Sequence, residues 1–521
     1  MSDAGAIRQN IADTLRRTAA RLPHKLAIQC GETSWSYLQF DQLCNRLANG
    51  LMSRNLAVGD RVAVLARNSH SFAALRFAVA RCGALLVPIN FMLNADECVY
   101  ILKHCGARLL FLDSSTLDQG LAAAKRSPEL SQVFWMPGEH QPSRIPPAGM
   151  ASFQELVHVN ANEPKVLLPT PALAQIVYTS GTESLPKGAM LTHEALLTQY
   201  VSCLLDAEIA EEDRLLHAMP LYHCAQLDVF LGPAIYAGAS NIIVSQALPE
   251  ILLPLLAAHN ISAFFAPPTV WISLLRSALF ETTNLTALKK GYYGASIMPV
   301  EVLTEIQRRL PTLRLWNLYG QTEIAPLAAV LKPADQVRKA GTAGRPVINV
   351  ETRVVDDHGA SVAPGEIGEI VHRSPQLMLG YYNSPEQTAA AFRDGWFHSG
   401  DLATQDSEGY LTVVDRKKDM IKTGGENVSS REVEDCIYKL PAVSEVAVIG
   451  LPDPRWIESV TAVVVLRAGR QLDESGLIEH CRKQLASFKA PKRVIFVQQL
   501  PRNPSGKLLK RELRLQFGNA V

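Results

Sequence analysis

A run of hydroxyls, glycines and one lysine follows a short apolar segment in the middle of the chain. From Tyr178 to His193 the sequence reads YTSGTESLPKGAMLTH. The preceding residues, 175–178, are apolar and partly β-branched, which predicts a buried strand. The glycines and Pro186 predict irregular backbone over 179–188. Backbone N–H groups and hydroxyls in such a loop bind phosphate oxygens, and Lys187 adds a point charge. A phosphate loop is thus indicated, with an ordinary surface hairpin loop as the alternative.

The spacing of Gly181 and Pro186-Lys187-Gly188 does not match the P-loop NTPase pattern. The stretch instead resembles the phosphate loop of the adenylate-forming enzymes, which include acyl-CoA synthetases, peptide-synthetase adenylation domains and beetle luciferases. Matching stretches recur in the same order from about residue 30 to the C-terminus. One departure is at Glu183 and Ser184, where the family usually has Thr and Gly. The resemblance implies that the phosphates are bound by Thr179, Ser180, Gly181, Thr182 and Lys187.

Length and composition set wide limits on the fold. A chain of 521 residues exceeds one hydrophobic core and should divide into two or more units. Its 47% hydrophobic and 19% charged residues are ordinary for a globular protein, and its formal net charge is only +1. Nothing in this balance indicates nucleic acid as a partner, so phosphates have to be met by local geometry.

Cysteine usage and the apolar segments bear on the compartment. Nine scattered cysteines without a Cys-x-x-Cys pair predict reduced, mostly buried thiols and a cytoplasmic protein. His223 and Cys224 are adjacent, and in an extended segment they would point to opposite faces, so no Cys–His nucleophile is predicted. Residues 1–10 lack the apolar core of a signal peptide. The longest apolar stretch, 229–244, is broken by Gly and Pro and predicts core rather than a transmembrane span.

The first three hundred residues alternate between strand-like and helix-like segments. Strands are expected over 61–65, 84–88 and 109–112, an amphipathic helix over 71–81 and a second helix over 95–104. Such alternation predicts a mostly parallel sheet with helices on both faces. A similar pattern from Leu215 to Trp316 predicts a second such layer. The fold class is therefore α/β.

The pattern of predicted secondary structure changes after Gly341. Short strands with Gly/Pro turns predict a small antiparallel barrel or sheet, and the charged run 415–419 precedes a compact α+β segment. The expected strands and helices here are 350–355, 368–372 and 410–414, then 430–440, 443–450, 460–466, 474–485 and 508–517. With the family resemblance, this implies a large N-terminal adenylating domain, 1–416, whose small β subdomain begins at about 341. A small C-terminal domain, 417–521, would rotate about a hinge at Lys418.

A second motif, Tyr319-Gly320-Gln321-Thr322-Glu323, follows the apolar strand 313–316. The resemblance implies that Tyr319 stacks on adenine beside Gly320 and that Thr322 bonds the α-phosphate. It also assigns Mg²⁺ to Glu323 together with Thr182, and hard oxygen ligands suit this ion. The loop between the acyl pocket and adenine matches Gly294, Ala295 and Ser296.

Further family positions lie toward the C-terminus. The resemblance places Asp401 and Arg416 on the ribose, where a carboxylate accepts hydroxyls and a guanidinium bonds oxygens bidentately. Lys507 matches the catalytic lysine between the acid's carboxylate and the α-phosphate. After domain rotation, Lys422 and the strand of Gly424 and Gly425 would enter the site, with Gly425 lining the pantetheine tunnel.

The segment 220–223 resembles the family's acid-binding pocket and places His223 near the carboxylate, with a purely structural histidine as the alternative. Apolar residues over 225–231 favour an apolar tail, which means a medium- to long-chain fatty acid or an aromatic acid. Leu227 stands where some long-chain synthetases carry a tryptophan gate. That difference argues against gated long-chain specificity.

The expected activity is an acid–thiol ligase that forms acyl-AMP from ATP and passes the acyl group to CoA, releasing AMP and pyrophosphate. Its cofactors and substrates would be ATP, Mg²⁺, CoA and the acid. Alternatives are a fatty acyl-AMP ligase serving a carrier protein, a luciferase-like oxidoreductase and, ranked last, a binding protein without turnover. A homodimer and peripheral contact with a membrane both stay open.

Overall fold

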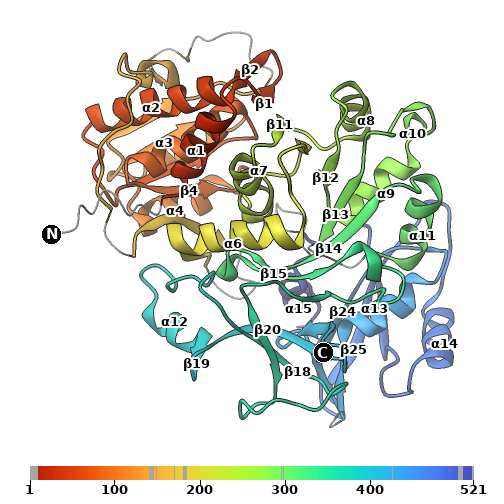
Figure 1. The fold of residues 1–521 in the computed structure, drawn as a ribbon. Helices are drawn as coiled ribbons and strands as arrows, with labels where there is room; N and C mark the ends of the chain where they lie inside the picture. The colour runs from red at the N-terminus through yellow and green to blue at the C-terminus, as the bar shows by residue number, and fades with distance from the viewer. Residues whose placement is uncertain are drawn as a thin grey trace. The chain divides into compact units, whose positions relative to one another are not determined.

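The computed structural model describes residues 10–139, 146–147, 149–168, 171–179, 185–294, 296, 298–424, 426–502 and 508–518. Their contacts divide the chain into two compact units, drawn as a ribbon in Figure 1. The first unit extends to Thr179 and also contains Pro186–Glu351 and Arg373–Phe397. The second contains Leu185, Thr352–His372 and the described chain from His398 onward.

Two mostly parallel sheets build the first unit. One has the strand order β16-β15-β14-β13-β12-β10-β11-β1-β2, and the other has the order β7-β6-β5-β3-β4-β8-β9. Within the residues that the structure describes, antiparallel pairing in these sheets occurs only toward the edges, for example between β8 and β9. The predicted βαβ alternation and the second, similar layer are therefore confirmed.

The strands of the first of these sheets are β1 (Leu26–Cys30), β2 (Thr33–Ser36), β10 (Arg214–His217), β11 (Ser240–Ile243), β12 (Ala263–Phe265), β13 (Lys290–Gly294), β14 (Arg314–Gly320), β15 (Leu327–Leu331) and β16 (Arg345–Pro346). Those of the second are β3 (Arg61–Leu65), β4 (Leu85–Ile89), β5 (Leu109–Leu112), β6 (Gln132–Trp135), β7 (Ala151–Ser152), β8 (Leu173–Thr179) and β9 (Lys187–Thr192).

The helices of this unit are α1 (Ala12–Arg21), α2 (Tyr37–Ser53), α3 (His70–Arg81), α4 (Ala95–Cys105), α5 (Leu117–Ala124), α6 (His193–Asp206), α7 (Gly232–Ala237), α8 (Pro249–Ala258), α9 (Pro268–Arg276), α10 (Leu279–Thr282), α11 (Val300–Arg309) and α12 (Pro385–Ala391). Short 3₁₀ or π segments are η1 (Phe153–Leu156), η2 (Ala225–Leu231), η3 (Thr322–Ile324) and η4 (Pro333–Asp335). Helix α3 was expected to be amphipathic, and this is wrong, because all twelve of its residues are buried. It contacts both α1 and α2, so the polar residues of its sequence lie inside the unit.

Burial of α3 places a charged side chain in the core. Arg76 is 2% exposed and donates to the Asp228 carboxylate at 2.6 Å, and that carboxylate is completely buried. Gln175 accepts from Arg76 at 2.5 Å and donates to the other oxygen of Asp228 at 2.7 Å. Burial raises the pKa of Asp228, and Arg76 and Gln175 oppose that shift. The network therefore connects η2 to α3 and β8 through three side chains that satisfy one another's hydrogen bonds.

The second unit contains an α+β part and most of a five-stranded sheet, of which the short strand β19 belongs to the first unit. The five-stranded sheet has the order β17-β18-β20-β19, with β21 paired to β20, and the α+β part has the strand order β23-β22-β25-β24, with β26 beside β25. This confirms the predicted small sheet and the α+β segment after it. The strands are β17 (Glu351–Val355), β18 (Gly368–Arg373), β19 (Phe392–Arg393), β20 (Trp396–Gln405), β21 (Leu411–Arg416), β22 (Ile421–Thr423), β23 (Glu426–Val428), β24 (Val443–Asp453), β25 (Ile457–Leu466) and β26 (Arg493–Phe496). The helices are α13 (Ser430–Tyr438), α14 (Glu474–Gln484) and α15 (Lys510–Gly518).

All nine cysteines are free and buried, as the sequence predicts. Within the described ranges, no helix combines the length and the apolar composition that crossing a membrane requires.

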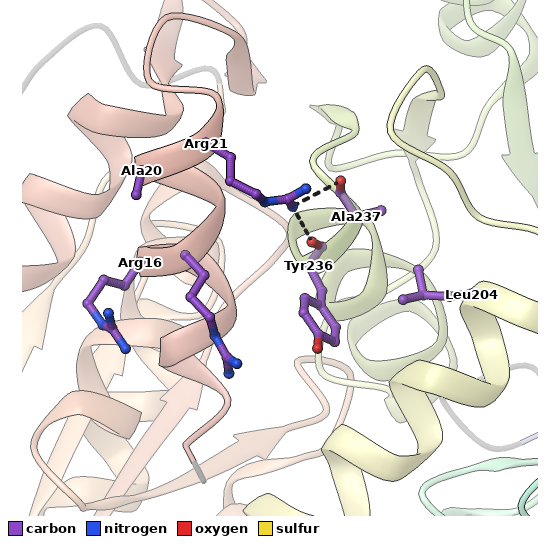
Figure 2. Close-up of a pocket in the computed structure, with 7 residues that line it drawn as sticks. Arg16, Ala20, Arg21, Leu204, Tyr236 and Ala237 are labelled. Carbon is purple, nitrogen blue, oxygen red and sulfur yellow. Dashed lines mark hydrogen bonds between the residues drawn. The ribbon is translucent and has the colours of Figure 1, made fainter. Parts of the chain in front are cut away.

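Figure 2 shows a surface pocket of the first unit that α1 and the end of α7 border. Its basic side chains are used in packing. Arg21 donates to the carbonyl oxygens of Tyr236 at 3.2 Å and Ala237 at 3.5 Å, and Arg17 lies 6.0 Å from the Tyr236 ring centroid. None of the predicted site residues that the structure describes lines this pocket. The pocket therefore serves the attachment of α1 rather than the predicted chemistry.

We expect Asp228→Ala to lower the free energy of unfolding by roughly 3–5 kcal/mol, because it leaves the Arg76 guanidinium buried without its counter-charge. Asp96→Ala is the matched control, since the pair of Asp96 and Arg126 is exposed. Its cost should stay within about 1 kcal/mol. Urea unfolding of both variants measures the difference, and equal costs would contradict this account of the core.

Candidate functional site

The predicted phosphate loop connects two antiparallel strands, β8 and β9. Thr179 pairs with Lys187 and Tyr178 pairs with Gly188, so these residues are regular strand. The expectation of irregular backbone over 179–188 is thus wrong at both ends. Close packing favours glycine at position 188 of β9, because a Cβ there would come within 2.7 Å of Ile176 Cγ2. The predicted ligands Ser180, Gly181 and Thr182, with Glu183, lie outside the described residues.

An aromatic cluster on α4 holds both ends of this hairpin connection. His104 Nδ1 lies 2.7 Å from the hydroxyl of Tyr178, at the end of β8. Burial lowers the pKa of His104 and raises the pKa of Tyr178, so a neutral imidazole and a neutral phenol share this hydrogen bond. Tyr100 stacks on His104 with ring centroids 5.3 Å apart, and its hydroxyl donates to the carbonyl oxygen of Pro186 at 3.3 Å. Sequence reasoning missed this cluster, because α4 is far from the loop in sequence.

The other edge of β9 is bonded to residues 378–382, which lie beyond the second motif in sequence. Met190 N–H donates to Gly380 O at 3.0 Å, and Tyr382 N–H donates to Gly188 O at 2.8 Å. Met378 N–H donates to the carbonyl oxygen of Glu323 at 2.8 Å. The segment therefore bridges β9 to η3, which carries Thr322 and Glu323.

Tyr381 lies at the centre of this arrangement. Its hydroxyl donates to Glu323 Oε1 at 2.9 Å, and Lys187 Nζ lies 5.0 Å from its ring centroid. The structure thus brings the predicted phosphate-loop lysine and the predicted metal ligand onto one tyrosine. No pattern in the sequence indicates this role for Tyr381, because the contact to Glu323 spans 58 positions.

The donor chemistry around Glu323 fits Mg²⁺. Its side chain is half-buried, one oxygen accepts from Tyr381, and among the described residues Oε2 has no hydrogen-bond donor. The described residues contain no group of three or more His, Cys, Asp and Glu side chains that could hold a metal alone. An ion here would rely on this carboxylate together with phosphate oxygens, which is common for Mg²⁺.

Thr322 is placed against the acid-pocket segment. Its Oγ1 lies 3.3 Å from Cys224 Sγ. The expectation that His223 and Cys224 are extended is wrong, because the chain turns there into η2, and Sγ lies 3.9 Å from His223 Nδ1. Burial raises the pKa of Cys224 to about 12, so the thiol stays protonated and is not a nucleophile. The side chain of His223 is exposed, and its Nδ1 accepts from Ala225 N–H at 3.1 Å, which puts the proton of the neutral ring on Nε2.

Parallel pairing of β13 and β14 brings the adenine-loop residues to one edge. Gly294 pairs with Leu318, next to Tyr319 and Gly320 at the carboxyl end of β14. In open α/β sheets, ligands bind outside the carboxyl ends of the strands. Gly294 has a packing reason of its own, since a Cβ there would come within 2.5 Å of Leu318 O. Tyr319 is half-buried and Ser296 is exposed, whereas Ala295 lies outside the described residues.

The second unit pairs the two predicted ribose ligands. Asp401 and Arg416 are directly opposite on β20 and β21, and Arg416 Nε lies 3.1 Å from Asp401 Oδ1. Nearby, His398 and Lys417 both contact the Glu369 carboxylate at 3.2 Å. Burial alone would raise the pKa of Glu369, but these partners hold it below its usual value.

Residues predicted for the second half-reaction follow β21. Lys418 is exposed, and Lys422 is exposed on β22. Gly424 has φ +61°, and a Cβ would meet the Trp456 ring at 2.9 Å, so both backbone conformation and packing require glycine. Its N–H donates to Trp456 O at 2.8 Å, a neighbour that sequence reasoning missed. Gly425 and Lys507 lie outside the described residues.

Comparison with known families agrees with this arrangement. The family model for AMP-binding enzymes matches residues 15–382, and the family model for the AMP-binding enzyme C-terminal domain matches residues 432–507. The chain belongs to the AMP-binding enzyme family. The predicted adenylate-forming fold and the enzyme class, an AMP-forming acid–thiol ligase, are thereby confirmed.

Relatives that are named for different acids have similar sequence identity to this AMP-binding enzyme. A feruloyl-CoA synthase from Amycolatopsis sp is 36% identical over 96% of this chain and 98% of the relative. A long-chain-fatty-acid–CoA ligase from Mycobacterium tuberculosis is 34% identical over 98% of this chain and 99% of the relative. The crystal structure of ATP-bound MatB from Rhodopseudomonas palustris superposes with a TM-score of 0.88 at 31% identity, covering 98% and 99% of the two chains.

We expect His104→Ala to raise the KM for ATP severalfold, because it removes the hydrogen bond to Tyr178 and the stack under Tyr100 at the two ends of the loop. The KM for the acid should change little. Steady-state kinetics with each substrate varied in turn measure both constants. An unchanged KM for ATP in a folded variant would show that the cluster does not set the loop.

Proposed function

We propose that this enzyme activates a carboxylic acid with an apolar tail, with a medium- to long-chain fatty acid as the first candidate, and transfers it from AMP to CoA. The mostly apolar stretch 225–231, which follows the acid-pocket segment, supports this choice of substrate. Its two polar side chains are both used inside the protein: Asp228 bonds Arg76 and Gln175, and Gln226 bonds His217 Nδ1 at 2.7 Å. A substrate tail would therefore meet the apolar side chains of 225–231.

An aromatic acid is the second candidate. The feruloyl-CoA synthase among the relatives supports it, at an identity close to that of the fatty-acid ligase. Aromatic rings also stand behind the pocket segment, where Phe230 stacks on Phe265 with centroids 4.6 Å apart and contacts Tyr292. These rings are core residues, so they shape the pocket wall and do not by themselves select an aromatic substrate.

In the first half-reaction, the acid's carboxylate attacks the α-phosphate of ATP and pyrophosphate leaves. We assign Lys507 and Thr322 to the charge that develops at the α-phosphate, and His223 to the neighbourhood of the carboxylate. Lys187 with Thr179, Ser180, Gly181 and Thr182 would hold the β- and γ-phosphates. Glu323 and Thr182 would hold Mg²⁺, which neutralises charge on the departing pyrophosphate.

The nucleoside is assigned to further residues. Tyr319 and Gly320, with the loop of Gly294, Ala295 and Ser296, would contact adenine. Asp401 and Arg416, which lie opposite each other, would bind the ribose hydroxyls. The 3.1 Å contact between them places a carboxylate and a guanidinium side by side for this role.

In the second half-reaction, the thiol of CoA attacks the acyl carbonyl and AMP leaves. We propose that the chain divides into domains 1–416 and 417–521 and that the smaller one rotates about Lys418. Lys507 would then leave, while Lys422, Gly424 and Gly425 would approach. The left-handed φ of Gly424, which glycine adopts readily, and its close contact with Trp456 support a role for this turn that needs a residue without a side chain.

The proposal is tested with purified enzyme, Mg·ATP, CoA and acids from acetate to oleate, with benzoate and cinnamate, scored by mass spectrometry. We expect acyl-CoA to peak within the fatty acids of medium to long chain. A peak at cinnamate would favour the aromatic candidate instead. Accumulated acyl-AMP without acyl-CoA would identify a donor to a carrier protein, and the absence of both products would contradict a ligase.

We expect Lys507→Ala to abolish acid-dependent pyrophosphate release while largely sparing thioester formation from supplied acyl-AMP, because its charge is needed only at the α-phosphate. The two half-reactions are assayed separately on the same preparation. Lys489→Ala is the control, since Lys489 forms an ion pair with Glu432 on the surface of the same domain. Equal losses in both half-reactions would remove Lys507 from its assigned role.

A further inference from the structure

We propose that Tyr381 is a positioning residue that sets the Glu323 carboxylate for the nucleotide's divalent cation and couples it to Lys187. This inference rests on the proposed function, because it needs Glu323 to face that cation. It goes beyond it by assigning a role to a side chain outside both sequence motifs.

The first support is the hydrogen bond itself. Tyr381 donates to Glu323 Oε1 at 2.9 Å, and among the described residues the second oxygen has no donor. A carboxylate held by one oxygen has a restricted rotation, so the other oxygen keeps one direction. Outer partners of this kind orient metal-binding carboxylates, and their loss commonly weakens metal binding by about 10–100-fold.

The second support is the position of Lys187. Its ammonium lies 5.0 Å from the ring centroid of Tyr381, within the range of a cation–π contact. The phenol therefore has a positive charge over its ring and a negative charge at its hydroxyl. A triphosphate needs both groups, the lysine directly and the carboxylate through the cation. One side chain consequently fixes the relative positions of two charges that act on the same substrate.

The third support is how firmly Tyr381 itself is held. It is 8% exposed, it forms a β-bridge with Ala189 of β9, and its N–H donates to Thr388 Oγ1 of α12 at 2.9 Å. The neighbouring residues Gly380 and Tyr382 are bonded to β9 as well. The backbone of Tyr381 is therefore fixed independently of its hydroxyl, so removing that hydroxyl should leave the ring in place.

The test uses Tyr381→Phe, which deletes the hydroxyl and keeps the ring beneath Lys187. Mn²⁺ is titrated by electron paramagnetic resonance into full-length enzyme with a non-hydrolysable ATP analogue. We expect the Kd for Mn²⁺ to rise by about 10-fold or more. In turnover, the concentration of Mg²⁺ at half-maximal rate should rise, while the KM for the acid and for CoA stays close to wild type.

Two further variants separate positioning from a merely structural role. Tyr37→Phe removes another buried phenol bond, to Ala239 O at 2.6 Å, away from the site. It should lower thermal stability without changing Mn²⁺ binding. If Tyr381 acts through Glu323, adding Tyr381→Phe to Glu323→Gln should weaken Mn²⁺ binding no further than Glu323→Gln alone.

An unchanged Kd for Mn²⁺ in folded Tyr381→Phe would overturn the inference, as would full additivity with Glu323→Gln. Failure of the proposed function has a different signature. In that case the wild-type enzyme would form no acyl-AMP or acyl-CoA with any acid, whereas the Mn²⁺ titrations could still be read.

Discussion

Strand β9 is hydrogen-bonded along both of its edges, and the predicted phosphate chemistry of the first unit depends on that constraint. On one edge β8 pairs with it and fixes the two ends of the phosphate loop. On the other edge the residues around Tyr381 pair with it and reach to Glu323. A lysine in one sequence motif and a carboxylate in another are therefore placed by the same strand. Any change that displaced β9 would move both charges together.

A chain with a formal net charge of +1 cannot attract a triphosphate by a general field. The triphosphate must instead be bound by nearby charged side chains, and neutral side chains position these charged groups. Tyr381 contacts both Lys187 and Glu323, and His104 is hydrogen-bonded to Tyr178 at the start of the loop. Such hydrogen bonds fix the ends of flexible side chains before the substrate arrives, which is how a site stabilises developing charge without rearrangement.

The sequence predicted the sheets and most of their strands well, because local patterns of apolar and turn residues determine these elements. Strands such as Arg61–Leu65 and Leu109–Leu112 have the expected bounds, and the two sheets and the later α+β part follow from alternation and turn residues. The motif residues Lys187, Thr322, Glu323, Asp401 and Arg416 were found by family resemblance, and the structure gives each a defined place. Their assigned roles, and those of Lys507 and Gly425, stay predictions.

What the sequence did not predict are contacts between distant segments. Tyr381, the cluster of Tyr100 and His104, and Trp456 behind Gly424 occur in segments without a recognisable pattern, and their partners are set by tertiary pairing. The irregular loop expected over 179–188 was wrong for a related reason, because pairing with β8 overrides the weak strand preference of glycine at 188. The full burial of α3 likewise depends on neighbours that periodicity does not show.

The central claim is that one site adenylates the acid and then transfers it. Rapid-quench analysis of a single turnover, with ATP labelled in its adenosine and a substrate acid, tests it most directly. We expect acyl-AMP to appear with pyrophosphate and then to decay to AMP as acyl-CoA forms, and to persist when CoA is left out. Formation of ADP and phosphate, or of acyl-CoA without an earlier acyl-AMP, would contradict it.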